Sequence, residues 1–201
     1  MVAIPLAQHQ EHADVDHFVV FDNASWADFQ HALELRGDRS APRLTYSQGV
    51  LQLMSPSKTH ESIKSTIGQL VEAYCGAKQI DFGTYGGWTL ERKDLARGLE
   101  PDECYVFGMH PEAEIPDLAI EVIWTSGSID KLDVYRALGV KEVWVWRRGR
   151  LVGHILHADH YVESNISAVL PGLDLDHLAS FIDRPMASQS IREYRAALAR
   201  S

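Results

Sequence analysis

The sequence predicts a single α/β (α+β) domain with a mixed central sheet flanked by helices. Three observations favour this fold class. The 201 residues are enough for one domain with a substantial core. Helical patterns alternate along the chain with groups of strand-like patterns. The composition, with 45% hydrophobic and 23% charged residues, is that of an ordinary globular protein.

The N-terminal part of the chain contains one helix pattern. Residues 1–17 are polar and rich in His and Asp, so we expect them to be disordered and the domain to cover 18–201. The stretch "SWADFQHALELRG" predicts a helix that Ser25 caps, with Asp28 as the acidic partner of the cap. Gly37 is expected to end this helix, because glycine adopts the backbone conformation of a helix terminus without strain.

A hairpin and a long helix follow. The alternating stretch "RLTYSQGVLQLMS" predicts two strands joined by a turn at Gln48-Gly49. The stretch "SPSKTHESIKSTIGQLVEAYCGAK" has an apolar stripe at helical spacing, and Thr59 is its expected cap. Short strand-like pieces then lie around 79–91. These elements supply part of the sheet and a helix to cover it.

The C-terminal half holds the most hydrophobic strands. Residues 102–108 and 117–124 look like consecutive strands, and 128–140 reads as a short helix. The stretch 142–156 predicts a strand, a turn and a second strand, and 189–201 predicts a final helix. The helices therefore separate groups of strands along the chain, which is why the sheet is expected to be mixed.

The net charge and the cysteine content argue against several classes of protein. A net charge of −9 argues against wrapping nucleic acid by bulk electrostatics, but it suits a carboxylate site for a divalent metal. No apolar run approaches the roughly 18 residues of a membrane span, and the N-terminus lacks a secretory signal pattern. Cys75 and Cys104 form no metal or redox spacing, so we expect free core thiols in a cytoplasmic protein with no membrane partner.

The strand 117–124 carries two carboxylates within an apolar run. Because side chains alternate along a strand, Asp117, Ala119 and Glu121 share one face, and the other face is wholly apolar. Asp117 and Glu121 lie about 13 Å apart along the strand, which is too far to ligate one metal together. Glu121 therefore needs a partner on a neighbouring strand.

The preceding strand offers that partner. If 102–107 and 116–121 form an antiparallel hairpin in which residue 107 faces residue 116, Asp102 lies opposite Glu121. Directly opposed residues have Cβ atoms about 5 Å apart, so two carboxylates there could share a divalent ion. In the alternative reading, Asp102 is a surface turn residue and Glu121 an edge-strand acid in a salt bridge. The pattern alone leaves both readings open.

Several segments together resemble the Uma2 family, which belongs to the PD-(D/E)XK, restriction-endonuclease-like superfamily. The segments are "SPSKTHESIKSTIGQL", "EPDECYVFG", "IPDLAIEVIWTSGSIDKLDVYRALGVKEVWVW" and "LPGLDLDHLASFI". The resemblance runs from about residue 42 to 183 and is specific as an ordered set. It implies a restriction-endonuclease-like core, namely a mixed central sheet with flanking helices, and a divalent-metal phosphodiesterase site.

The resemblance implies roles for individual acids. Asp102 matches the family's first Pro-Asp and Glu121 the acid of the (D/E)XK strand, so both would be metal ligands. Glu61 matches the family's helical acid and would help to bind metal, although a first-turn acid also suits the helix dipole. His60 beside it is expected to be a surface helix residue. Asp117 is expected to be structural, accepting backbone hydrogen bonds or pairing with a base.

The lysine of the superfamily pattern is displaced. Ile123 occupies the position where the pattern places it. In Uma2-like sequences a lysine on the following helix, four residues before a tyrosine, replaces it. Lys131 precedes Tyr135 by that interval, so the resemblance implies that Lys131 is the catalytic lysine. The alternative is a solvated lysine at the start of a helix.

Two further features keep alternatives open. His154, His157 and His160 could hold a metal, but the strand period puts the first two on opposite faces and favours an exposed hairpin. The arginines of "WVWRRGR" could contact nucleic acid, or they could mark a buried strand that ends in a basic turn.

The expected function is a metal-dependent endonuclease that hydrolyses DNA phosphodiester bonds. In this reading Asp102 and Glu121, helped by Glu61, hold Mg²⁺ or Mn²⁺, and Lys131 orients the attacking water or neutralises the transition state. DNA as substrate comes from the resemblance, which also leaves a homodimer open. The alternatives are a catalytically inactive binding or assembly module on the same fold, and a metal phosphoesterase that acts on small nucleotides.

Overall fold

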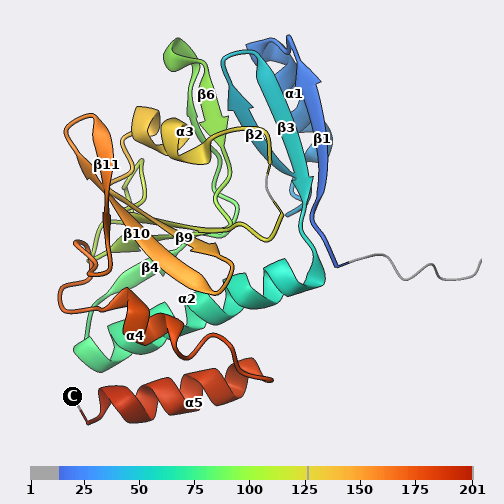
Figure 1. Cartoon of the computed structure of the whole chain (residues 1–201). Helices are drawn as coiled ribbons and strands as arrows, with labels where there is room; N and C mark the ends of the chain where they lie inside the picture. The colour runs from blue at the N-terminus through green and yellow to red at the C-terminus, as the bar shows by residue number, and fades with distance from the viewer. Residues whose placement is uncertain (1–13, 126, 201) are drawn as a thin grey trace, which may run out of the picture.

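The computed structural model describes residues 14–125 and 127–200, which form two β-sheets with helices packed around them (Figure 1). Five α-helices and both parallel and antiparallel strand pairs are present in this part of the chain, so the predicted mixed fold class is confirmed. The expectation of disorder falls mostly on residues 1–13, which lie outside the described residues. None of the described helices is both long and apolar enough to cross a bilayer.

One sheet has five antiparallel strands and carries the N-terminal hairpin. Its strands, in spatial order, are β1 (His17–Asp22), β3 (Val50–Ser55), β2 (Arg43–Ser47), β6 (Arg97–Leu99) and β5 (Leu90–Arg92). Gln48 and Gly49 join β2 to β3 with φ of 45° and 96°, the tight turn that the sequence predicts. A short 3₁₀ turn, η1 (Lys93–Leu95), links β5 to β6.

Helix α1 (Trp26–Arg36) packs against this sheet through Phe29, which is fully buried. Ser25 and Asp28 form the predicted capping box, and the helix ends at Gly37 as expected. Each capping partner satisfies an amide that the helix itself leaves without an acceptor. Local sequence therefore sets both ends of α1.

The second sheet is mixed and has six strands. In spatial order they are β11 (His160–Ser164), β10 (Arg150–His157), β9 (Glu142–Arg147), β8 (Leu118–Val122), β7 (Glu103–Phe107) and β4 (Phe82–Thr84). Only β8 and β9 pair in parallel among these strands, and helix α3 (Lys131–Leu138) makes the crossover between them. Strand β8 is consequently an interior strand.

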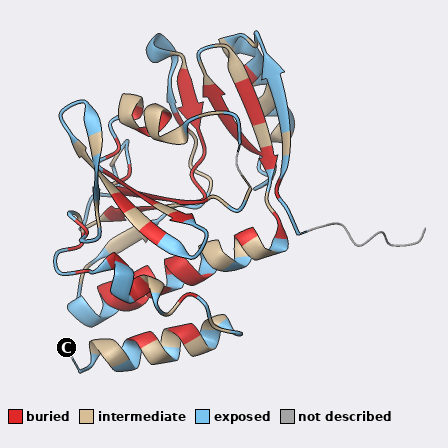
Figure 2. Cartoon of the chain, viewed as in Figure 1, coloured by how far each residue is buried: buried red, intermediate tan, exposed pale blue. Residues whose placement is uncertain are grey.

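The main core lies between one face of this sheet and three helices. Helix α2 (Lys58–Lys78) crosses beneath the sheet, with α4 (Leu175–Ala179) and α5 (Ala187–Leu198) beside it (Figures 1 and 2). Leu118, Ile120 and Val122 of β8 point into this core, as the alternation of the strand predicts. The cap of α2 is Ser57, whose side chain accepts the amide of His60, so the prediction of Thr59 was wrong.

The opposite face of β8 meets α3. Ala119 packs in a smaller core with Val134, Tyr135 and Leu138 of that helix. Because Glu121 follows Ala119 by two residues, its side chain points to the same side of the sheet. This arrangement places a carboxylate at the start of α3 and between the two sheets.

Candidate functional site

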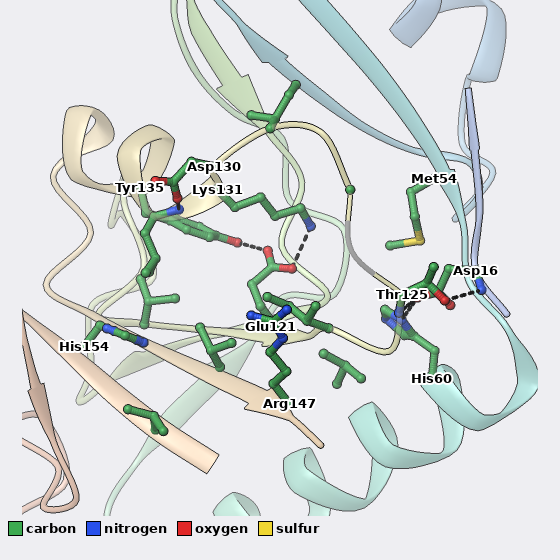
Figure 3. A pocket seen from close by; sticks show the side chains of 18 of the residues that line it. Asp16, Met54, His60, Glu121, Thr125, Asp130, Lys131, Tyr135, Arg147 and His154 are labelled. Atoms are coloured by element: carbon green, nitrogen blue, oxygen red, sulfur yellow. Dashed lines mark hydrogen bonds and ion pairs between the residues drawn. The ribbon is translucent and has the colours of Figure 1, made fainter. Parts of the chain in front are cut away.

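A cavity of about 590 Å³ lies between the two sheets and opens beside α3 (Figure 3). Glu121, Lys131 and Tyr135 line one side of it. The other elements contribute residues of the opposite sheet and of the β9–β10 hairpin, including Phe18, Gln52, Met54, Arg147, Arg150 and His154. Segments that are far apart in the sequence therefore line the same cavity.

The β7–β8 register brings two acids together as predicted. Glu103 pairs with Ile120 and Cys104 with Ala119, so one further step places Asp102 opposite Glu121. Asp102 Oδ2 accepts a hydrogen bond of 2.7 Å from the amide of Val122. Asp102 is fully buried and Glu121 is 3% exposed, which excludes the reading of a surface turn and an edge-strand acid.

Helix α3 points two side chains at Glu121 (Figure 3). The Lys131 ammonium donates to Glu121 Oε2 at 2.6 Å, and the Tyr135 hydroxyl donates to Oε1. Residues four apart share one face of a helix, so the Lys-Tyr spacing aims both groups at the same carboxylate. Asp130 caps the helix and accepts the amides of Leu132 and Asp133, which sets where this face begins. Lys131 is therefore not a solvated lysine.

The charged groups of this cluster shift one another's pKa values. Burial and the nearby Asp102 carboxylate raise the pKa of Glu121, although Lys131 opposes that shift. Burial alone would lower the pKa of Lys131, but Glu121 and Asp102 raise it, so the amine is protonated at neutral pH. Despite its burial, Asp102 has a pKa well below the ordinary value because Lys131, His60 and Arg43 surround it.

Two bases that the sequence reading did not assign to the site contact Asp102. His60 Nε2 lies 3.0 Å from Oδ2, and Arg43 NH1 lies 3.2 Å from Oδ1. His60 is only 1% exposed, so the prediction of a surface helix residue was wrong. Burial disfavours the charged imidazole, but Asp102 and Asp16 outweigh it and raise the pKa of His60 to about 9. His60 is thus a cation between two carboxylates.

The second of these carboxylates, Asp16, comes from the segment predicted to be disordered. Its Oδ2 lies 3.1 Å from His60 Nδ1 and accepts the amide of Thr125 at 3.2 Å. Its Oδ1 accepts the amide of Ser57, the cap of α2, at 2.9 Å. Asp16 therefore ties the start of α2 to the segment that follows β8, and it orients the imidazole that faces Asp102.

Glu61 joins this network indirectly. Its carboxylate accepts a hydrogen bond of 2.9 Å from Arg43 and lies 3.1 Å from the ammonium of Lys64. Burial would raise the pKa of Glu61, but Arg43 and Lys64 lower it. The Glu61 side chain is 40% exposed, unlike the fully buried Asp102. The Arg43 guanidinium thus lies between Glu61 and Asp102.

Asp117 has the structural surroundings that its position predicts. It accepts the amide of Phe107 at 2.9 Å and pairs with the Lys141 ammonium at 2.7 Å. The histidines of the β10–β11 hairpin gather no metal-ligating cluster, and no group of three or more such side chains is found anywhere in residues 14–125 and 127–200.

The donor set of Asp102 and Glu121 fits Mg²⁺ or Mn²⁺. Both supply carboxylate oxygens, the ligands that these hard cations prefer. Asp102 Oδ1 is buried and, within the described structure, accepts no hydrogen bond, while Arg43 NH1 forms an ion pair with it at 3.2 Å. Magnesium is commonly held by one or two carboxylates together with water and substrate phosphates, so a two-carboxylate site is sufficient.

The chain matches a known protein family. The family model Uma2, described as "Putative restriction endonuclease", matches residues 26–182, which is most of the chain and includes Asp102, Glu121 and Lys131. No curated protein matches the chain. Asp16 lies before the matched region.

Proposed function

The chain belongs to the Uma2 family of restriction-endonuclease-like proteins, and from this premise we propose that it is a metal-dependent endonuclease acting on DNA. The observation that carries the proposal is that Glu121 and Lys131 contact each other at one cavity and that the β7–β8 register places the buried Asp102 opposite Glu121. Two adjacent carboxylates can hold a divalent metal, and a nearby lysine can stabilise the charge that develops during phosphodiester hydrolysis. Ile123 removes the usual lysine, and Lys131 reaches Glu121 from α3 instead.

Each residue has a distinct task in this proposal. Asp102 and Glu121 would hold the metal, which supplies charge neutralisation and an activated water when it is bound. Lys131 is placed to orient the attacking water or to stabilise the charge that develops on the phosphoryl oxygens. Tyr135 donates a hydrogen bond to one oxygen of Glu121. Lys131, His60 and Arg43 keep Asp102 ionised.

The arginines of the β9–β10 turn support a polynucleotide rather than a small nucleotide as the substrate. Arg147 and Arg150 are cross-strand partners at this turn, and both line the cavity that holds Glu121. Arg148 lies in the turn between them. The planar guanidinium group matches the geometry of a phosphate, so a turn with these arginines suits a phosphate backbone. A phosphate backbone that passes this turn would lead into the site.

The decisive test is cleavage of supercoiled and single-stranded DNA with Mn²⁺. Wild type should nick or linearise the plasmid, and Glu121→Ala should not, because the variant loses a metal ligand. Asp117→Asn is the matched control: it changes the other acid of the same region, whose partners are Phe107 and Lys141, and should retain activity. Equal cleavage by wild type and Glu121→Ala, or no cleavage by wild type, would reject the nuclease function and favour an inactive binding module.

A second prediction concerns the basic turn. Arg147→Gln/Arg150→Gln should raise the KM for duplex DNA and leave kcat nearly unchanged, because the arginines contact the backbone away from the scissile bond. The slope of log affinity against log salt should become shallower by about 0.9 for each phosphate that is no longer neutralised. The comparison is Arg192→Gln/Arg195→Gln on α5, whose arginines are exposed and lie outside the cavity. An unchanged salt slope would argue that the substrate is a small nucleotide.

A further inference from the structure

The substrate has to reach a carboxylate that is almost fully enclosed. Glu121 is 3% exposed and lines the cavity between the two sheets, so a phosphodiester reaches it through that cavity. The cavity volume of about 590 Å³ is that of a pocket for a small molecule rather than that of a groove for a nucleic-acid duplex. A nucleotide that is still paired with its complement would not fit there.

The floor of the cavity is apolar beside Glu121. Glu121 pairs with Val145 of β9, and Val145 pairs with Val152 of β10, so the three side chains form a row across one face of the sheet. Neighbouring strands are about 4.8 Å apart, so the row extends about 10 Å from Glu121. Both valines line the cavity and are half-buried. This valine row, Val145 and Val152, therefore offers apolar surface on the scale of one nucleotide.

The segment that leads into α3 covers the valine row from the other side. Ile129 and Leu132 line the cavity there and are half-buried. His154 follows Val152 by two residues on β10, so it points to the same side of the sheet and adds an imidazole to the cavity (Figure 3). Apolar walls with a few polar groups are typical of pockets that bind a small organic group, and a nucleobase is such a group.

The basic turn lies next to the valine row. Arg147 and Arg150 pair with each other, and each is two residues from a valine of the row along its own strand. The arginines are therefore on the same face of the sheet, about 7 Å from the row. A nucleotide whose phosphate lies beside these arginines can place its base over the valines.

We propose that the cavity takes up an unpaired nucleotide, with its base over Val145 and Val152 and the scissile phosphate at Glu121. The DNA strand to be cut is then either single-stranded or has one nucleotide extruded from the duplex, as in enzymes that act on a base inside a pocket. This inference rests on the proposed nuclease function, because it names the form of DNA that the same site accepts.

The first measurement is DNA binding without metal, so that it does not depend on cleavage. Fluorescence anisotropy would compare one labelled sequence as a single strand, as a duplex with one mismatch and as a fully paired duplex. The single strand should bind at least about tenfold more tightly than the paired duplex, with the mismatched duplex between them, because extrusion costs less at a mismatch. Equal affinity for all three, or displacement of the single strand by an equal concentration of dAMP, would overturn the proposal.

Substitutions in the valine row test the position of the base. Val152→Phe should weaken binding of the single strand about tenfold, because the ring would fill the space for the base. Val162→Phe is the matched control: Val162 on β11 is 44% exposed, lies outside the cavity and pairs with Ile155, whose side chain points away from the face of His154. A Val152→Phe protein that melts normally and binds the single strand as tightly as Val162→Phe would overturn the proposal.

Val152→Ala keeps the test available if the larger side chain prevents folding. It adds no bulk and removes only apolar contact, so it should weaken binding of the single strand by about fourfold or more, the effect of one lost methylene group. Unchanged binding by a folded Val152→Ala protein would count against the valine row.

Cleavage separates this inference from the proposed function. With Mn²⁺, wild type should cut the single strand and the mismatched duplex about tenfold faster than the fully paired duplex. If all three were cut at one rate, the nuclease function would stand and the unpaired nucleotide would be rejected. If none were cut while the single strand still bound preferentially, the nuclease function would be rejected and the cavity would remain a binding site for an unpaired nucleotide.

Discussion

Lys131→Met is expected to slow Mn²⁺-dependent DNA cleavage by about 100- to 1000-fold, the effect of removing one group that stabilises developing charge in a transition state. Lys131 donates to Glu121 at 2.6 Å and approaches the cavity from α3. No lysine is available at position 123 to take over its task, because that residue is Ile123. Single-turnover rates with saturating DNA would measure the loss directly.

The fold should survive this substitution. Burial already raises the pKa of Glu121, so without the ammonium its carboxyl can take up a proton and remain hydrogen-bonded to Tyr135. Lys141→Met makes the same chemical change at a lysine that pairs with Asp117, whose partners lie outside the cluster, and should cleave at the wild-type rate. Wild-type cleavage by Lys131→Met, with both variants melting normally, would remove Lys131 from the catalytic proposal.

Asp102→Asn is expected to lower the free energy of unfolding by about 3–5 kcal/mol, the usual cost of leaving buried charges without a partner. Asp102 is fully buried with His60 and Arg43 beside it. The amide keeps the shape of the side chain but loses the charge that offsets the burial of these two cations. Urea denaturation at neutral pH, followed by tryptophan fluorescence, would measure the difference.

Asp94→Asn is the control for this measurement. Asp94 also pairs with an arginine, at 2.6 Å, but its side chain is 61% exposed. Solvent screens such a pair, so the control should unfold at nearly the same urea concentration as wild type. If Asp102→Asn were as stable as this control, the cluster would not be held together by charge, and the coupling between Asp102, His60 and Arg43 would have to be abandoned.

The part of the site that could be predicted rests on local geometry. Strands β7 and β8 are consecutive in the chain and pair antiparallel, and strand alternation then places Asp102 opposite Glu121. Helical spacing likewise aligns Lys131 with Tyr135, and the two-residue turn at Gln48-Gly49 follows from its backbone preference. Each of these predictions requires only residues that are near in the sequence and the side-chain period of one strand or one helix.

The part of the site and of the fold that could not be predicted depends on contacts between segments that are far apart in the sequence. Arg43, His60 and Asp16 come from β2, α2 and the chain before β1, and nothing in their local sequence distinguishes them from surface residues. The division of the strands into two sheets is equally hidden, because periodicity shows that a strand exists but not which strand lies beside it. Strand β1 is not predicted either, because it begins at the end of a polar segment and its apolar residues follow one another without alternating with polar ones.

The position of Asp16 has a practical consequence for how this protein is handled. The family match begins at residue 26, yet one carboxylate that steadies the surroundings of Asp102 precedes it by ten residues. A chain trimmed to the matched portion would lose that carboxylate together with β1, and His60 would keep only one of its two acidic partners. Failure of such a shortened protein to cleave DNA would report on the trimming rather than on the chemistry of the family.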